Sequence, residues 1–179
     1  MISLFEDCSS VSRLDVSNFD TSKVTSLSKM FFNVRRVKYL NVSNFNTNIV
    51  TDMSHLFQKC DALTSLDVSN FNTSLVTTME HMFSGIPLKE LNLKNFDTKN
   101  VVNMVGMFQG CRSMLSFDLS SFDTSSVTDL CTECLNLVSI LSNMIFQILI
   151  LNKLQIWLVC SKKIMKYNLW IYQILIQAL

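Results

Sequence analysis

The chain has 179 residues, enough for one domain, and only 16% of them are charged whereas 49% are hydrophobic. This balance excludes a disordered chain and, with a formal net charge of +1, a nucleic-acid binder that relies on a basic surface. Two unlike segments make up these averages. Residues 1–140 carry 11 Lys/Arg and 14 Asp/Glu, whereas residues 141–179 carry 4 Lys, no acidic residue and 26 apolar residues.

Five near copies of one string follow each other along the first segment. They are LDVSNFDTSKV (14–24), LNVSNFNTNIV (40–50), LDVSNFNTSLV (66–76), LNLKNFDTKNV (91–101) and FDLSSFDTSSV (117–127). Their phenylalanines are 26, 26, 25 and 26 residues apart: Phe19, Phe45, Phe71, Phe96 and Phe122. Such a period is typical of repeat proteins in which each copy stacks on the next. We therefore expect these five rings to form one buried row.

Each copy contains two hydrophobic patterns. Apolar and polar residues alternate over residues 14–17, which predicts a short strand with Asp15 and Ser17 facing solvent. The apolar spacing from Val24 to Phe31 is i, i+3, i+6, i+7, which predicts a short amphipathic helix. Side-chain oxygens at residues 20–22 are placed to cap its N-terminus. The sequence thus predicts an α/β repeat, with one short strand and one short helical segment in each coil.

The strings of the form LDVSNFDTS-x-VT-x-M-x-x-MF-x-x-C, over about residues 1–130, resemble the BspA-like leucine-rich repeat family. This is a mycoplasma-type repeat of surface proteins, of unknown function. The resemblance implies a leucine-rich-repeat solenoid, here of about five coils of 25–26 residues, in a cell-surface or secreted protein that serves in adhesion. It implies no catalytic residues. Phe19 departs from the plainer leucine-rich pattern, which has Asn at that position.

Both ends of the predicted solenoid are uncapped. Residues 1–8 match the end of a helical block, because Leu4-Phe5 falls in register with Met30-Phe31. No basic residue precedes Arg13, so this chain shows no signal peptide. We expect a fragment that starts in mid-repeat, with a leucine-rich-repeat domain over residues 1–140 and an apolar tail over residues 141–179.

Two interpretations of the tail are possible. Residues 144–160 resemble a membrane anchor, but the run is short for a span and is interrupted by Asn152 and Lys153. Alternatively, the tail is frameshifted repeat sequence. Back-translating residues 146–151 with AT-rich codons and regrouping the bases gives Ser-Asn-Phe-Asp-Thr, and the phenylalanines recovered across the tail continue the row in steps of 26. We favour the frameshift, which sequencing of the gene would test.

The six cysteines do not suggest disulfides. Cys8, Cys60 and Cys111 share one position of the repeat, which Val34 fills in another copy, so we expect buried structural thiols. Cys8 and Cys60 lie two coils apart, roughly 10 Å, which is too far for a bond between them. The pair Cys131 and Cys134 forms a CxxC without a second CxxC or a neighbouring His, and we assign it no metal.

His55 and His81 are 26 residues apart and should lie on adjacent coils. We expect them to be solvated helix residues. A metal enzyme that uses this pair, with Asp52 and Glu80 as oxygen donors, is the alternative, although a tetrahedral site needs more ligands than two imidazoles. No nucleotide-binding, metalloprotease or nucleophile motif occurs. The sequence therefore predicts no enzyme activity, no catalytic or metal site and no cofactor.

The predicted strands bring two polar rows together as a candidate ligand-binding face. The first row is Asp15, Asn41, Asp67, Asn92 and Asp118, and the second is Ser17, Ser43, Ser69, Lys94 and Ser120. Alternating Asp with Asn keeps like charges apart on neighbouring coils. We expect a protein or glycan ligand on this face, no nucleic acid, and membrane contact only through the tail. The alternatives are a structural spacer that binds nothing and a membrane-anchored protein that uses residues 144–160.

Overall fold

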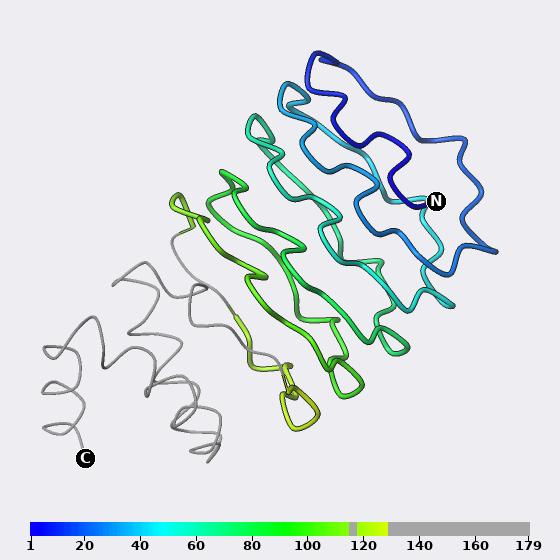
Figure 1. Cartoon of the computed structure of the whole chain (residues 1–179), viewed down its shortest axis with the longest axis vertical. Coiled ribbons are helices and arrows are strands. Elements are labelled where there is room, and N and C mark those ends of the chain that lie inside the picture. Colours follow the sequence, from blue (N-terminus) through cyan, green and yellow to red (C-terminus); the bar gives the residue numbers. More distant parts are fainter. Residues whose placement is uncertain (115–117, 129–179) are drawn as a thin grey trace, which may run out of the picture.

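A computed structural model describes residues 1–114 and 118–128 of the chain. Figure 1 shows that successive turns of the backbone lie side by side in the order of the sequence. We call residues 14–39, 40–65, 66–90 and 91–114 coils 1 to 4. Residues 1–13 pack before coil 1, and residues 118–128 follow coil 4. Hydrogen bonds join residues 23 to 29 positions apart along this stack.

The expected α/β leucine-rich-repeat solenoid is wrong. The described residues contain no helix, and their only strand-like pairing consists of isolated parallel bridges. These bridges join Ser26 to Asp52, Tyr39 to Ser65, Asp52 to Thr78, and Thr78 to Asn103. The repeats do stack, but each coil is built of turns rather than of a strand and a helix.

The predicted helix is replaced by a series of tight turns. In coil 1 the N–H of Met30 donates to the carbonyl oxygen of Leu27, three residues back, at 3.0 Å. The next N–H, of Phe31, leaves the coil and donates to Leu56 of coil 2 at 3.1 Å. Lys29 and Asn33 have φ values of 57° and 61°, and a right-handed helix cannot continue through such residues. The helix-like spacing of apolar residues therefore comes from successive turns that each point a side chain inward.

The predicted strand also fails for a local reason. Val16 is buried and Asp15 is exposed, so the alternation of burial is real. However, the N–H of Ser17 donates to the carboxylate of Asp15 at 3.0 Å, and the N–H of Phe19 donates to Val16. These donors are used within the coil, so no continuous ladder forms with the neighbouring coil.

A row of buried threonines links the coils. The hydroxyl of Thr21 donates to the carbonyl oxygen of Asn46 at 3.1 Å and accepts from the N–H of the same residue at 2.7 Å. The same two bonds are made by the other members of this threonine row, which is Thr21, Thr47, Thr73 and Thr98. All four are at most 2% exposed. The expected role of residues 20–22 as helix caps is therefore wrong for Thr21, whose oxygen acts between coils.

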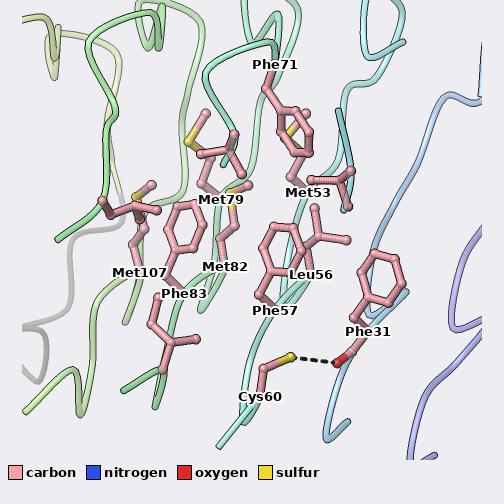
Figure 2. Packing of buried hydrophobic residues seen from close by; sticks show 14 of the residues in the cluster. Phe31, Met53, Leu56, Phe57, Cys60, Phe71, Met79, Met82, Phe83 and Met107 are labelled. Carbon is pink, nitrogen blue, oxygen red and sulfur yellow. Dashed lines mark hydrogen bonds between the residues drawn. The ribbon is translucent and has the colours of Figure 1, made fainter. Parts of the chain in front are cut away.

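Two phenylalanine rows fill the core. The expected row contains four buried rings, Phe45, Phe71, Phe96 and Phe122, and a partly buried one, Phe19. A second row, Phe5, Phe31, Phe57, Phe83 and Phe108, forms a continuous parallel stack with ring centroids 5.7 to 5.9 Å apart. Figure 2 shows Phe31, Phe57 and Phe83 from this second row, with Phe71 of the first beside them.

The two phenylalanine rows also contact each other. Phe31 lies 6.2 Å from Phe45, and Phe57 lies 6.5 Å from Phe71, measured between ring centroids. Aromatic pairs at such distances contribute about 0.5–1.5 kcal/mol beyond the area that they bury. Since these contacts join a ring of one coil to rings of the next, the aromatic core is shared along the stack.

Candidate ligand-binding face

The residues of the candidate face lie at repeat-equivalent positions on the surface. In the described structure nine of the ten are exposed, and Ser69 is half-buried. The apolar residues between the two rows, such as Val16, Val42 and Val68, are buried. The local alternation therefore presents the two polar rows to solvent without a regular strand.

The first row has a structural function in its own coil. Each of its side chains accepts a hydrogen bond from the N–H two residues later, at 2.9 to 3.2 Å. Carboxylate and amide oxygens are equally suited to this turn. This explains the exchange of Asp and Asn along the row through local geometry, in addition to the expected spacing of charge.

These turns also favour the charged form of the acids. The pKa of Asp15 lies below its ordinary value because the Ser17 side chain and then the Ser17 backbone N–H donate to the carboxylate. The pKa values of Asp67 and Asp118 are lowered in the same way by Ser69 and Ser120. The face is therefore anionic in these coils over the neutral pH range, with each carboxylate held in a fixed orientation.

The second row adds hydroxyl groups and one cation. Lys94 approaches the carboxylate of Asp118 on the next coil, with 3.9 Å between Nζ and Oδ2. Both side chains are largely exposed, so this ion pair contributes little to stability. The hydroxyl of Ser120 donates to Asp118 at 2.6 Å. The arrangement can offer hydrogen bonds to a ligand.

An asparagine ladder borders this face. The amide of Asn44 donates to the carbonyl oxygens of Val16 and Phe19, each at 3.1 Å. Asn70 bonds to coil 2 in the same way, and Asn95 donates to Ser69. An asparagine ladder is thus present in these coils together with the first phenylalanine row, although Phe19 stands where the plainer leucine-rich pattern has Asn.

The histidine pair is brought together, although not as solvated helix residues. The rings of His55 and His81 stack with centroids 5.3 Å apart, and both residues have positive φ. Nδ1 of His55 lies 2.7 Å from Oε1 of Gln58, and its Nε2 lies 3.8 Å from Glu80. No group of three or more possible ligands for a metal ion occurs among the described residues.

The expected thiol positions are apolar sites of the core. Cys60 and Cys111 are buried, and their thiols donate to the carbonyl oxygens of Phe31 and Phe83, respectively. Figure 2 shows the bond from Cys60. Burial raises the pKa of Cys60 to about 12. Cys8 is half-buried. The CxxC at residues 131–134 lies outside the described residues.

The threonine row is the element that the sequence interpretation missed. It had a visible signal, because Thr21 follows Phe19 by two residues and this spacing recurs in every copy. The tail over residues 141–179, with its candidate anchor, lies outside the described part of the chain. Within that part, no helix has the length and apolar character needed to span a membrane.

These features define a class of repeat protein whose irregular coils stack through threonine, asparagine and phenylalanine rows. The family model "Mycoplasma protein of unknown function, DUF285" matches the chain twice, over residues 1–88 and 66–133. The chain belongs to this family. The comparisons with curated proteins and with solved structures gave no match.

Proposed function

We propose that this chain is part of a non-enzymatic cell-surface or secreted protein that binds a protein or glycan through the candidate face. The observation that supports the proposal is the repetition of exposed polar groups at a fixed register. Asp15, Asn41 and Asp67 stand on successive coils that share one rigid core. A ligand with its own regular spacing of polar groups could bind several coils at once.

The sequence resemblance supports the cellular setting of this proposal. Its strings are similar to those of BspA-like leucine-rich repeat surface proteins, and membership of the mycoplasma family is compatible with this origin. We propose that the BspA-like repeats and the repeats of this mycoplasma family are related in sequence. Adhesion to host proteins is the form of binding that it favours.

A structural spacer is the second candidate. One observation favours it, because every side chain of the first row accepts a hydrogen bond from its own backbone. These turns account for the Asp and Asn residues of the row without any ligand. A spacer would hold other domains away from the cell surface and would show no saturable binding of its own.

Binding of the full chain to immobilised extracellular-matrix proteins and to a glycan array separates the two. The test variant is Ser43→Lys with Ser69→Lys, since Lys94 occupies the same row and shows that lysine fits there. The control is Ile49→Lys with Leu75→Lys, because these exposed residues share a row with Lys23. A face that binds loses at least tenfold affinity in the test variant and little in the control. Saturable binding that both variants keep would place the ligand elsewhere, and no binding by the wild type would favour the spacer.

A further inference from the structure

Charge is separated between two parts of each coil. The segments that return towards the candidate face, residues 33–39, 59–65 and 85–90, carry five cations and two acids. We call the five cations the basic edge: Arg35, Arg36, Lys38, Lys59 and Lys89. All five are exposed. From residue 21 to residue 51 the chain contains no acidic residue at all. An edge of positive charge therefore exists in a domain whose overall charge is slightly negative.

The hydrogen bonds of the return segments bring these cations together. The N–H of Thr64 donates to the carbonyl oxygen of Lys38 at 2.9 Å, and Tyr39 forms a bridge with Ser65. The return segments of coils 1 and 2 are thus adjacent. By its position in the repeat, Lys89 of coil 3 is equivalent to Lys38 of coil 1 and Thr64 of coil 2.

A second contact adds Lys59 to the edge. Its Nζ lies 5.6 Å from the ring centroid of Phe32 in coil 1, while Lys29 lies 5.8 Å from the same ring. The Nε of Arg35 donates to Oδ1 of Asn33, the residue after Phe32, at 2.6 Å. The aromatic ring orients Lys59 and the amide orients Arg35, whereas Lys29 is paired with Glu6 at 3.5 Å.

Neutralisation of the edge is incomplete. Arg35 faces the carboxylate of Asp61 at 3.6 Å, and both side chains are about half exposed. In the described structure neither Arg36 nor Lys38 forms an ion pair with a carboxylate. Uncompensated cations close together on this edge repel one another, and a bound polyanion would remove this repulsion.

We infer that the basic edge binds a sulfated polysaccharide, lying across coils 1 to 3. The planar guanidinium groups of Arg35 and Arg36 match sulfate oxygens in pairs, and the lysines supply point charges. Tyr39 is 67% exposed at the end of the edge, where its ring can pack against the apolar side of a sugar. This surface is distinct from the two rows of the candidate face, and the inference does not depend on their function.

The composition of the edge favours a glycan over other polyanions. Single-stranded nucleic acids are held by several stacking aromatic rings, whereas this edge exposes only Tyr39 and the ring of Phe32 lies near two lysines. Binding to an anionic membrane uses an apolar face beside the charges. Among the described residues of the edge, Tyr39 is the only large exposed hydrophobic side chain.

The test uses the full chain on a column of immobilised heparin, eluted with a gradient of NaCl. The test variant is Arg36→Gln with Lys38→Gln, and the control is Lys23→Gln with Lys99→Gln, which removes the same charge elsewhere on the surface. We expect the wild type and the control to be retained, and the test variant to elute at distinctly lower salt. The dependence of log affinity on log salt should fall by about one unit for each cation removed from the edge.

Four results would overturn the inference. The wild type could pass through the heparin column, the two variants could elute together, or chemically desulfated heparin could retain the protein equally well. Retention on single-stranded DNA to higher salt than on heparin would assign the edge to nucleic acid instead. Urea unfolding of each variant confirms that the substitutions at these exposed positions leave the fold intact.

Discussion

The hydroxyl of Thr47 donates to the carbonyl oxygen of Asn72 at 2.9 Å and accepts from the N–H of Asn72 at 2.8 Å. One buried side chain thereby satisfies both polar groups of a backbone unit on the next coil. The Thr47 hydroxyl has no access to water, since Thr47 is 2% exposed, and its hydrogen-bonding capacity is met by the Asn72 backbone. The contact fixes the register between coils 2 and 3 as well as stabilising them.

Replacing Thr47 with valine should destabilise the protein by about 2–4 kcal/mol. The change keeps the side-chain shape but leaves two backbone groups of Asn72 without a partner, each costing about 1–2 kcal/mol. Urea unfolding monitored by circular dichroism measures the loss. The matched control is Thr51→Val, because Thr51 is exposed and Val102 already occupies its row. Equal losses in the two variants would contradict the role of the threonine row.

Gly106→Ala should be poorly tolerated. Gly106 has a φ of +61°, and an added Cβ would overlap the ring of His81. The backbone term costs about 1–2 kcal/mol, and the overlap adds to it. The double variant Gly106→Ala with His81→Ala should recover the steric part, which a double-mutant cycle isolates. Gly110→Asn is the control, since φ is +72° there without an overlap and Asn33 fills that row in coil 1.

Phe57→Leu should cost more than Phe32→Leu. Phe57 is 0% exposed in the middle of the second phenylalanine row and stacks on Phe31 and Phe83, whereas Phe32 is half-buried. We expect a loss of about 1–3 kcal/mol for Phe57, from the stacking contacts and the space left behind, and under 1 kcal/mol for Phe32. The urea midpoints of the two variants measure these losses. A larger loss for Phe32→Leu than for Phe57→Leu would mean that stacking in the second phenylalanine row contributes little to the stability of the core.

The pH dependence of stability should reflect the turns of the first row. The folded-state pKa values of Asp15, Asp67 and Asp118 lie below the ordinary 3.8. Their contribution to stability is therefore complete above the unfolded pKa and is lost as the pH falls through the folded values. Thermal unfolding between about pH 6 and pH 2 should show a steeper loss for the wild type than for the triple Asp→Asn variant. Parallel curves would show that the turns do not stabilise the ionised acids.

Alkylation should distinguish the cysteines of the stack. Because the pKa of Cys60 is about 12, almost none of it is thiolate at pH 8, and its side chain is buried as well. Iodoacetamide added to the native protein should therefore modify Cys8 much faster than Cys60. Mass spectrometry of the peptides measures both rates. In urea the two rates should become similar, and rapid native labelling of Cys60 would contradict its position in the core.

The period of the sequence predicts which residues become neighbours, because like residues must stack when short units cannot bury their apolar faces alone. Phe45 and Phe71 are buried as this reasoning requires. The exposed positions of Asp15 and Asn41 also follow from the alternation around Val16 and Val42.

The secondary structure could not be predicted in the same way. An apolar spacing of three and four residues is typical of a helix, but a series of turns with a left-handed residue at Lys29 and Asn33 produces the same spacing. Nothing in the side chains of Lys29 or His55 requires positive φ, and it is set by the bonds between coils. Likewise, an Asp two residues before a Ser does not reveal whether the Ser17 N–H donates to the Asp15 carboxylate or to the next coil.

The return segment of coil 3 is one residue shorter than its neighbours. Ile86-Pro87-Leu88 spans the distance covered by Cys60-Asp61-Ala62-Leu63, and both Leu88 and Leu63 remain buried. A change in length is thus absorbed within one bend, and the next copy resumes the same pairing. Unequal recombination between copies could therefore lengthen or shorten the molecule in increments of one coil, about 4.8 Å, while each new junction joins repeat-equivalent residues.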